Sequence, residues 1–263
     1  MKRIARTSPN ARPSRLPLYA ASLLLALTSA SAAAADAGTG PFGVTAFAVA
    51  TARSARVGAL FPADRRAHLG GGHFCTASVV HSPHRNLVVT AAHCLKDRTE
   101  ALVFVPGYRD GEAPYGVWKV GRWFMPERWV KGRDEDSDVA FGVVEERGGG
   151  EGVEEVVGGN RFATGTATGA TAVTVTGYLN SREAPISCTD KPGLQSRTQQ
   201  RVACPGFGGG TSGSPWVNGD GAVVGVLGGH DGGGATADVS FSVVFGAEAA
   251  KLYREAERGS PSN

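Results

Sequence analysis

The five residues Thr90-Ala91-Ala92-His93-Cys94 form the most informative motif of the chain. It follows the apolar strand candidate Asn86–Val89 directly, so His93 stands where a strand ends. The two alanines allow a short turn to pack closely, and Cys94 can tie that turn to another strand. A lone histidine beside a strand is usually structural, but the five-residue motif as a whole marks His93 as a candidate for catalysis.

A second stretch, Gly210-Thr211-Ser212-Gly213-Ser214-Pro215, contains a candidate nucleophile. A serine hydroxyl is a weak nucleophile at its own pKa and needs a neighbouring base. Acyl transfer also needs backbone N–H groups for the negative oxygen that forms on attack. The glycine-rich backbone before Ser212 can turn sharply and present such groups. Composition alone would favour a surface loop, and Ser214 is the rival nucleophile within the stretch.

The third stretch, Asp134-Glu135-Asp136-Ser137-Asp138-Val139-Ala140-Phe141, offers three aspartates. Asp138 lies 45 residues after His93 and is followed at once by an apolar strand. We expect its carboxylate to orient the imidazole and to stabilise the charged form of the ring. Because an acidic run is usually a solvated loop, we interpret Asp134 and Asp136 as solvent-exposed.

Together these motifs resemble those of the chymotrypsin family of serine peptidases. Their chain order is His, Asp, Ser, whereas α/β-hydrolases run Ser, Asp or Glu, His and carry G-x-S-x-G, a pattern that Ser214 interrupts here. The resemblance implies a catalytic triad of His93, Asp138 and Ser212, with the N–H groups of Gly210 and Ser212 as the oxyanion hole. It further implies a serine endopeptidase that acts through an acyl-enzyme and needs no metal or organic cofactor.

One position departs from the trypsin-like pattern. In trypsin-like enzymes the residue before the nucleophile is an aspartate, which binds the new N-terminal ammonium after zymogen cleavage. Thr211 supplies no such charge, so this activation is not expected despite the sequence Arg56-Val57-Gly58. We interpret Val57–Phe61 as the first barrel strand instead. The stretch 211–215 is more similar to bacterial glutamyl endopeptidases, which also lack the aspartate.

The resemblance also locates the primary specificity pocket. Its base falls near Gly206 and Phe207, where no aspartate is present to attract arginine or lysine. Leu227 occupies the position at which glutamyl endopeptidases carry a histidine for the substrate carboxylate. We therefore expect a preference for an apolar or small side chain. Leu227, Gly228 and Gly229 form the expected edge that pairs with the substrate backbone.

The chain contains four cysteines: Cys75, Cys94, Cys188 and Cys204. An even number in an exported chain indicates two disulfides, for which three pairings exist, and no C-x₂-C spacing supports a zinc site. The resemblance implies the pair Cys75–Cys94, which flanks the histidine in the family. The pair Cys188–Cys204 would close a loop before the nucleophile and stabilise the fold by roughly 3 kcal/mol. No zinc-site spacing fits the cluster His68, His73, His81 and His84, which we interpret as exposed loop residues. His230, at the end of the expected substrate edge, could touch substrate, but we interpret it as a surface histidine.

The distribution of strands predicts an all-β fold. About six candidate strands lie on each side of the glycine- and glutamate-rich segment 148–160, which suits two six-stranded antiparallel β-barrels of the chymotrypsin type followed by a C-terminal helix. The predicted organisation is a signal peptide at 1–35, a propeptide or N-terminal arm at 36–55, an N-terminal barrel at 56–147, an inter-barrel loop at 148–160, a C-terminal barrel at 161–246, and a C-terminal helix and tail at 247–263.

The first 35 residues have the pattern of an export signal. A basic start precedes the apolar stretch Leu16–Leu27 and the small residues Ser29–Ala35, and the apolar stretch is too short for a lasting membrane span. Removal of this leader, which has five basic and no acidic residues, changes the net charge from +3 to about −2. No basic patch indicates a nucleic-acid partner. We therefore expect a secreted, extracellular monomer that acts on polypeptides.

Two other functions stay open on the sequence alone. One is a non-catalytic binding member of the same fold, and the other is an exported serine esterase. The first would be favoured by loss of a triad residue, but His93, Asp138 and Ser212 are all present. An active peptidase is the function that the sequence favours.

Overall fold

The computed structural model describes residues 42–95, 100–145 and 150–259. The predicted signal peptide at 1–35 lies outside the described residues. Within the part that is described, no helix is both long enough and apolar enough to span a bilayer.

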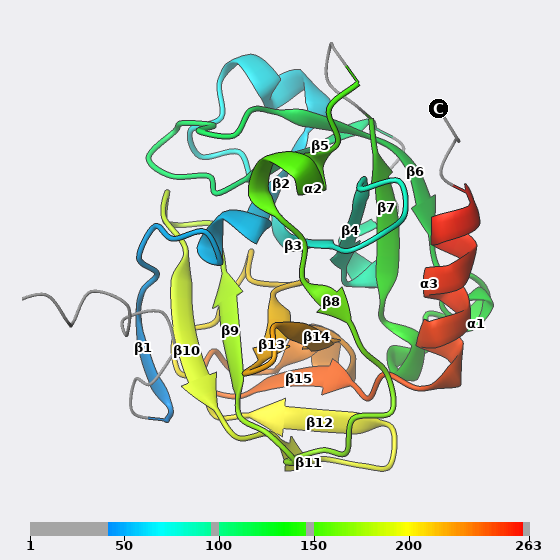
Figure 1. Cartoon of the computed structure of the whole chain (residues 1–263). Helices are drawn as coiled ribbons and strands as arrows, with labels where there is room; N and C mark the ends of the chain where they lie inside the picture. Colours follow the sequence, from blue (N-terminus) through cyan, green and yellow to red (C-terminus); the bar gives the residue numbers. More distant parts are fainter. Residues whose placement is uncertain (1–41, 96–99, 146–149, 260–263) are drawn as a thin grey trace, which may run out of the picture. The chain divides into compact units, whose positions relative to one another are not determined.

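The first half of the described chain is a closed antiparallel barrel of six strands in the order β2-β3-β4-β7-β6-β5 (Figure 1). Side chains alternate between two apolar environments along these strands, as the period of two in a β-strand requires. Leu60, Leu102 and Phe104 fill the barrel interior, whereas Ala59 and Val103 face outward into a second cluster. Nearly every position is therefore buried on one face or the other. The strands are β2 (Val57–Pro62), β3 (Cys75–Val80), β4 (Leu87–Thr90), β5 (Leu102–Pro106), β6 (Trp118–Phe124) and β7 (Ala140–Val144).

The second half consists of two sheets rather than a second closed barrel. A six-stranded sheet has the order β1-β10-β9-β13-β14-β8, and a three-stranded sheet has the order β11-β12-β15. The sheets join where the Ser242 hydroxyl accepts a hydrogen bond from the Val226 N–H at 3.0 Å, so a side chain replaces part of the β14–β15 ladder. The strands are β1 (Val44–Phe47), β8 (Arg161–Phe162), β9 (Val173–Gly177), β10 (Ile186–Asp190), β11 (Gly193–Leu194), β12 (Gln199–Val202), β13 (Pro215–Asn218), β14 (Ala222–Val226) and β15 (Ser240–Val243).

Two segments are more ordered than the sequence predicted. The predicted arm at 36–55 contributes β1, which pairs antiparallel with β10. The predicted loop at 148–160 contains the short helix α2 (Val153–Val157), where the Glu155 carboxylate accepts a hydrogen bond from the Gly152 N–H at 2.9 Å. Another short helix, α1 (Glu127–Gly132), precedes the acidic run.

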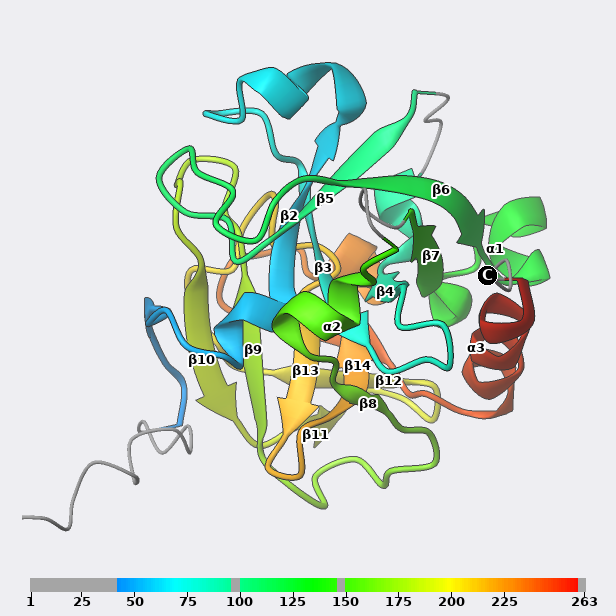
Figure 2. The same ribbon diagram turned by 45° about the horizontal axis from the view of Figure 1, so that its top comes forward.

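The C-terminal helix is present as predicted. It is α3 (Ala247–Gly259), and its buried residues Ala249, Leu252 and Ala256 repeat at helical spacing. They join an apolar cluster with Phe141 of β7 and Val226 of β14. Figure 2 shows α3 beside β6 and β7, on the side of the barrel away from β2.

Both disulfides are present, with the pairs that the sequence suggested. Cys75–Cys94 connects the start of β3 with the turn after β4. Cys188–Cys204 connects β10 with the segment after β12.

Candidate active site

The two halves meet at a glycine. Gly213 has a φ of +82°, and a Cβ there would lie 2.1 Å from Thr90 Oγ1 and 2.2 Å from the Thr76 carbonyl oxygen. Because only glycine fits, the turn that carries Ser212 lies directly against the end of β4 and the start of β3. The disulfide Cys75–Cys94 ties together the same two segments of the barrel.

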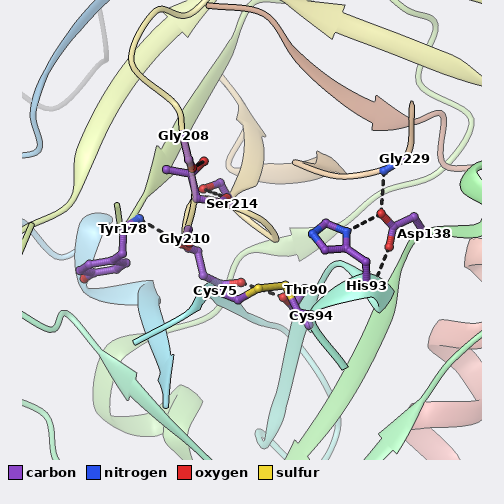
Figure 3. The surroundings of a disulfide bond; sticks show 12 residues. Cys75, Thr90, His93, Cys94, Asp138, Tyr178, Gly208, Gly210, Ser214 and Gly229 are labelled. Atoms are coloured by element: carbon purple, nitrogen blue, oxygen red, sulfur yellow. Dashed lines mark hydrogen bonds and ion pairs between the residues drawn. A yellow bond between two sulfur atoms is a disulfide. The ribbon is translucent and has the colours of Figure 1, made fainter. Parts of the chain in front are cut away.

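His93 and Asp138 form a hydrogen-bonded pair (Figure 3). The His93 Nδ1 lies 2.7 Å from Asp138 Oδ2, and the backbone N–H of His93 donates to Oδ1 at 2.8 Å. The Gly229 N–H also donates to Oδ2, at 2.7 Å. Because an ionised carboxylate only accepts hydrogen bonds, the imidazole proton is on Nδ1. In the neutral ring with its proton on Nδ1, the Nε2 atom carries a lone pair, which is the state that a general base needs.

The pair is shielded unequally from water. The Asp138 side chain is 1% exposed, whereas that of His93 is 21% exposed. Three N–H donors compensate the buried carboxylate for its lost hydration. The imidazole can therefore meet a substrate, while its orienting group stays inside the protein.

The other aspartates of the acidic run are not the solvated residues that the sequence predicted. Both are half-buried and have specific partners. Asp134 Oδ1 accepts from the Asp136 N–H at 3.0 Å and so caps the 3₁₀ turn Glu135–Ser137. Asp136 Oδ1 accepts from Gln199 Nε2 at 2.9 Å. The prediction overlooked that aspartate favours helix N-caps.

The turn that carries Ser212 is held by its own hydrogen bonds. The N–H and hydroxyl of Thr211 both donate to the Gly208 carbonyl, at 3.1 and 2.7 Å. The N–H and hydroxyl of Ser214 both donate to the Thr211 carbonyl, at 3.0 and 2.6 Å. Since Ser214 is fully buried and its hydroxyl is used in this way, it is not a nucleophile.

Ser212 itself is partly exposed. Its carbonyl accepts from the Thr76 N–H at 2.8 Å, which fixes it to the barrel that carries His93. Its hydroxyl makes no hydrogen bond with any residue that the structure describes, so Ser212 and His93 are not directly hydrogen-bonded here. Such contacts are often long in unliganded enzymes and shorten when substrate binds.

The direction of the Gly210 N–H group follows from a contact of the preceding carbonyl. The Gly209 carbonyl accepts from the Asn180 N–H at 2.8 Å, and the C=O and N–H of a trans peptide point in opposite directions. The Gly210 N–H therefore points away from Asn180. A side chain at Gly210 is excluded by its φ of +94° and by Asn180 Oδ1, 2.3 Å from the Cβ position. Among the described residues, the N–H groups of Gly210 and Ser212 have no acceptor, so both are free for an oxyanion.

The residue before Ser212 has no charged partner among the residues that the structure describes. Thr211 is fully buried, and its hydroxyl is satisfied inside the turn. Val57 begins β2, which pairs with β3 and β5 of the barrel. The interpretation of Val57–Phe61 as the first barrel strand is therefore confirmed.

The predicted substrate edge has fewer free groups than expected. Both the N–H and the carbonyl of Leu227 bond to the nucleophile turn, at 2.9 and 2.7 Å. The N–H groups of Gly228 and Gly229 also bond within the protein. The Gly228 carbonyl, which has no donor among the described residues, is left to accept from a substrate. Leu227 and Phe207 are buried in one apolar cluster.

The prediction of exposed histidines is wrong for His73. This residue is 5% exposed, and its ring packs against those of Phe61, Tyr108 and Tyr178. Its Nε2 lies 2.8 Å from the Leu179 carbonyl, so it acts as the donor there. The Phe61 ring, on β2, lies edge-on to the imidazole with 5.7 Å between the ring centroids.

One group of side chains in the described part has the spacing of metal ligands: Cys75, His93 and Cys94. Both sulfurs are joined in the disulfide, so neither can act as a thiolate ligand.

Sequence reasoning did not identify Thr76 or Asn180, although both hold the nucleophile turn. The available signal for Thr76 was a hydroxyl residue directly after Cys75 in a predicted strand, and the structure shows that this position is buried.

An imidazole oriented by a buried carboxylate, close to a serine turn where two β halves meet, is the arrangement of chymotrypsin-like serine peptidases. The model of the family described as Trypsin-like peptidase domain matches residues 75–226. The chain belongs to this family, and we conclude that it is a serine-type endopeptidase.

Solved structures agree with this assignment. Protease Anisep from Arthrobacter nicotinovorans is 25% identical, with a TM-score of 0.67 over 78% of this chain and 96% of that chain. The thermostable serine protease AL20 from an extremophilic microorganism is 28% identical, with a TM-score of 0.68 over 80% of this chain and 100% of that chain. A Glu endopeptidase shares the fold at 16% identity, with a TM-score of 0.63 over 83% of this chain and 98% of that chain. A comparison with curated proteins finds no match.

Proposed function

We propose that the protein is an exported endopeptidase in which Ser212 is the nucleophile, His93 the general base and Asp138 the group that orients it. The observation that carries the proposal is the Asp138 carboxylate, which holds both the backbone and the ring of His93. This leaves Nε2 as the ring nitrogen that does not contact Asp138, and the nearby turn carries Ser212, which is partly exposed.

The chemistry follows from these positions. His93 Nε2 takes the Ser212 proton as Oγ attacks the scissile carbonyl carbon, and the carbonyl oxygen becomes an oxyanion between the N–H groups of Gly210 and Ser212. His93 then gives the proton to the leaving amine, which breaks the peptide bond and leaves an acyl-enzyme. Water repeats the cycle, giving the second product and free Ser212.

A preference for apolar or small substrate side chains is the specificity that the pocket residues support. Leu227 and Phe207 are apolar and buried together, and no carboxylate or imidazole stands at these positions. A peptide library with all side chains at the cleaved position tests this. Dominant cleavage after arginine, lysine or glutamate would contradict it.

Export is supported by the leader-like residues 1–35 and by two disulfides, which persist in oxidising compartments. Mass spectrometry of the protein recovered from the medium of an expressing culture would locate the mature N-terminus. Retention of residues 1–35 in a cell-bound product would contradict this part of the proposal.

The decisive test compares Ser212→Ala with Ser214→Ala. Fluorophosphonate labelling and casein cleavage should both disappear in Ser212→Ala, because the nucleophile is lost. Ser214→Ala, which removes a hydroxyl from the same turn, should keep its labelling. A wild type that labels but cuts no peptide would indicate an esterase, and one that does not label would indicate a binding protein.

A further inference from the structure

The hydroxyl of Thr76 joins the two halves of the molecule behind the proposed oxyanion hole. Thr76 lies on β3 and is fully buried. Its Oγ1 accepts from the Tyr178 N–H at 3.0 Å and donates to the Gly210 carbonyl at 3.1 Å. Both partners belong to the second half of the chain, and both are labelled in Figure 3. One hydroxyl therefore satisfies two backbone groups across the junction.

The backbone around Gly210 needs such a restraint. Gly208, Gly209 and Gly210 are consecutive, and glycine has few conformational preferences of its own. The Gly210 N–H belongs to the same peptide as the Gly209 carbonyl, so rotation of this peptide would turn a carbonyl toward the place where an oxyanion forms. The next peptide carries the Gly210 carbonyl and the Thr211 N–H, and its orientation fixes the chain on the other side of Gly210. The Asn180 N–H holds the Gly209 carbonyl on one side, and Thr76 Oγ1 holds the Gly210 carbonyl on the other.

The backbone of Thr76 fixes the nucleophile as well. Its N–H donates to the Ser212 carbonyl at 2.8 Å, and its carbonyl accepts from Thr90 Oγ1 at 2.7 Å. Thr90 is three residues before His93. A single residue thus contacts the oxyanion turn, the nucleophile and the strand end that leads to the proposed base.

We propose that Thr76 is a positioning residue for catalysis, whose hydroxyl keeps the Gly210 N–H aimed at the developing oxyanion. This inference rests on the proposed function, because it takes Gly210 and Ser212 as the oxyanion hole. Thr76 touches neither the substrate nor the reacting atoms. Its contribution therefore belongs to kcat, since the ground-state carbonyl gains less from the hole than the transition state does.

The test compares Thr76→Val with Thr76→Ser, by active-site titration followed by kinetics on a chromogenic peptide. Valine keeps the shape and removes the hydroxyl, whereas serine keeps the hydroxyl. Loss of an entire oxyanion donor lowers kcat by about 10²–10³-fold, so we expect loss of its restraint to lower kcat by roughly 10–100-fold, with KM changed by less than about twofold. We expect Thr76→Ser to restore kcat to within about threefold of the wild type.

A second readout separates positioning from general stability. The affinity of a peptide aldehyde, which forms an oxyanion-bearing adduct, should fall with kcat in Thr76→Val, while the affinity of a product peptide stays the same. Ser78→Ala is the matched control, because Ser78 is a buried residue on the same strand whose hydroxyl accepts from Asn160 Nδ2 at 3.1 Å and donates to the Val79 carbonyl at 3.4 Å. It should lower the melting temperature without lowering kcat.

If Thr76→Val does not fold, Thr76→Cys decides, since a thiol is a weaker donor of similar size. A reduced kcat at unchanged KM supports the proposal. An unchanged kcat in the folded valine or cysteine variant overturns it while the proposed triad stands. If Ser212→Ala still cleaves peptide, the proposed function itself fails, whatever the Thr76 variants do.

Discussion

Replacement of Gly213 by alanine tests whether the junction of the two halves is as tight as the structure indicates. The new Cβ would lie 2.1 Å from Thr90 Oγ1 and 2.2 Å from the Thr76 carbonyl oxygen. Both distances are more than an ångström short of the separation of about 3.5 Å at which non-bonded atoms pack best. Both neighbours are buried, so neither can move away freely.

Two costs add at this position. Alanine at a φ of +82° costs about 1–2 kcal/mol, and overpacking of a well-packed site costs about 1–3 kcal/mol. We therefore expect Gly213→Ala to lower the free energy of unfolding by roughly 2–5 kcal/mol. The displaced Ser212 should also lose catalytic efficiency, because a misplacement of about 1 Å can cost about 10²-fold.

Gly221→Ala is the control for the backbone term. Gly221 has a φ of +72°, but nothing lies within 4 Å of its Cβ position. Urea unfolding followed by tryptophan fluorescence gives the free energies, and kcat/KM per titrated active site gives the catalytic effect. If Gly213→Ala loses no more stability than Gly221→Ala and keeps its kcat/KM, the close approach at the junction is not real.

Three further predictions follow from the site and its surroundings. Asp138→Asn should lower kcat by about 10⁴-fold with little change in KM. The three N–H groups that now bond to two carboxylate oxygens would find only one acceptor oxygen on the amide, which would favour the wrong tautomer of His93. A kcat within tenfold of the wild-type value in steady-state kinetics would contradict this role. In the double variant Cys188→Ala/Cys204→Ala, the free energy of unfolding should be roughly 3 kcal/mol lower than in the wild type, with the triad kept. An unchanged melting temperature would show that the disulfide does not restrain the unfolded chain. Burial raises the pKa of three tyrosines in the folded protein. Their contribution to the free energy of unfolding should therefore be complete below about pH 10, where unfolded tyrosine is still protonated, and should decline as the pH rises further. Ultraviolet titration should show these phenols ionising only as the protein unfolds, and their ionisation in the folded state would refute the raised pKa values. These tyrosines are Tyr108, Tyr178 and Tyr253.

The sequence allowed prediction of those parts that short contiguous patterns encode. The motif around His93 could be recognised because small residues, a histidine and a cysteine follow one another directly. The first barrel was predictable because nearly all of its strands are apolar runs, which become buried on both faces. Such motifs and apolar strands can be predicted without knowing which distant residues they contact.

Other features depend on partners that are remote in sequence. The role of Thr76 requires Tyr178 and Gly210, which are 102 and 134 residues away. His73 is buried because rings from three separate strands and loops surround it, although its own neighbourhood is rich in glycine. In the second half, the Val226 N–H bonds to the Ser242 side chain, which is 16 residues away, where the two sheets join. No local pattern reveals these contacts.

The threonine before the proposed nucleophile has a practical consequence. The turn is held by a hydroxyl that belongs to the turn itself, at 2.7 Å from the Gly208 carbonyl, and threonine carries no charge that could pair with an ammonium group. A tag or carrier protein fused ahead of Phe42 should therefore leave the catalytic machinery assembled.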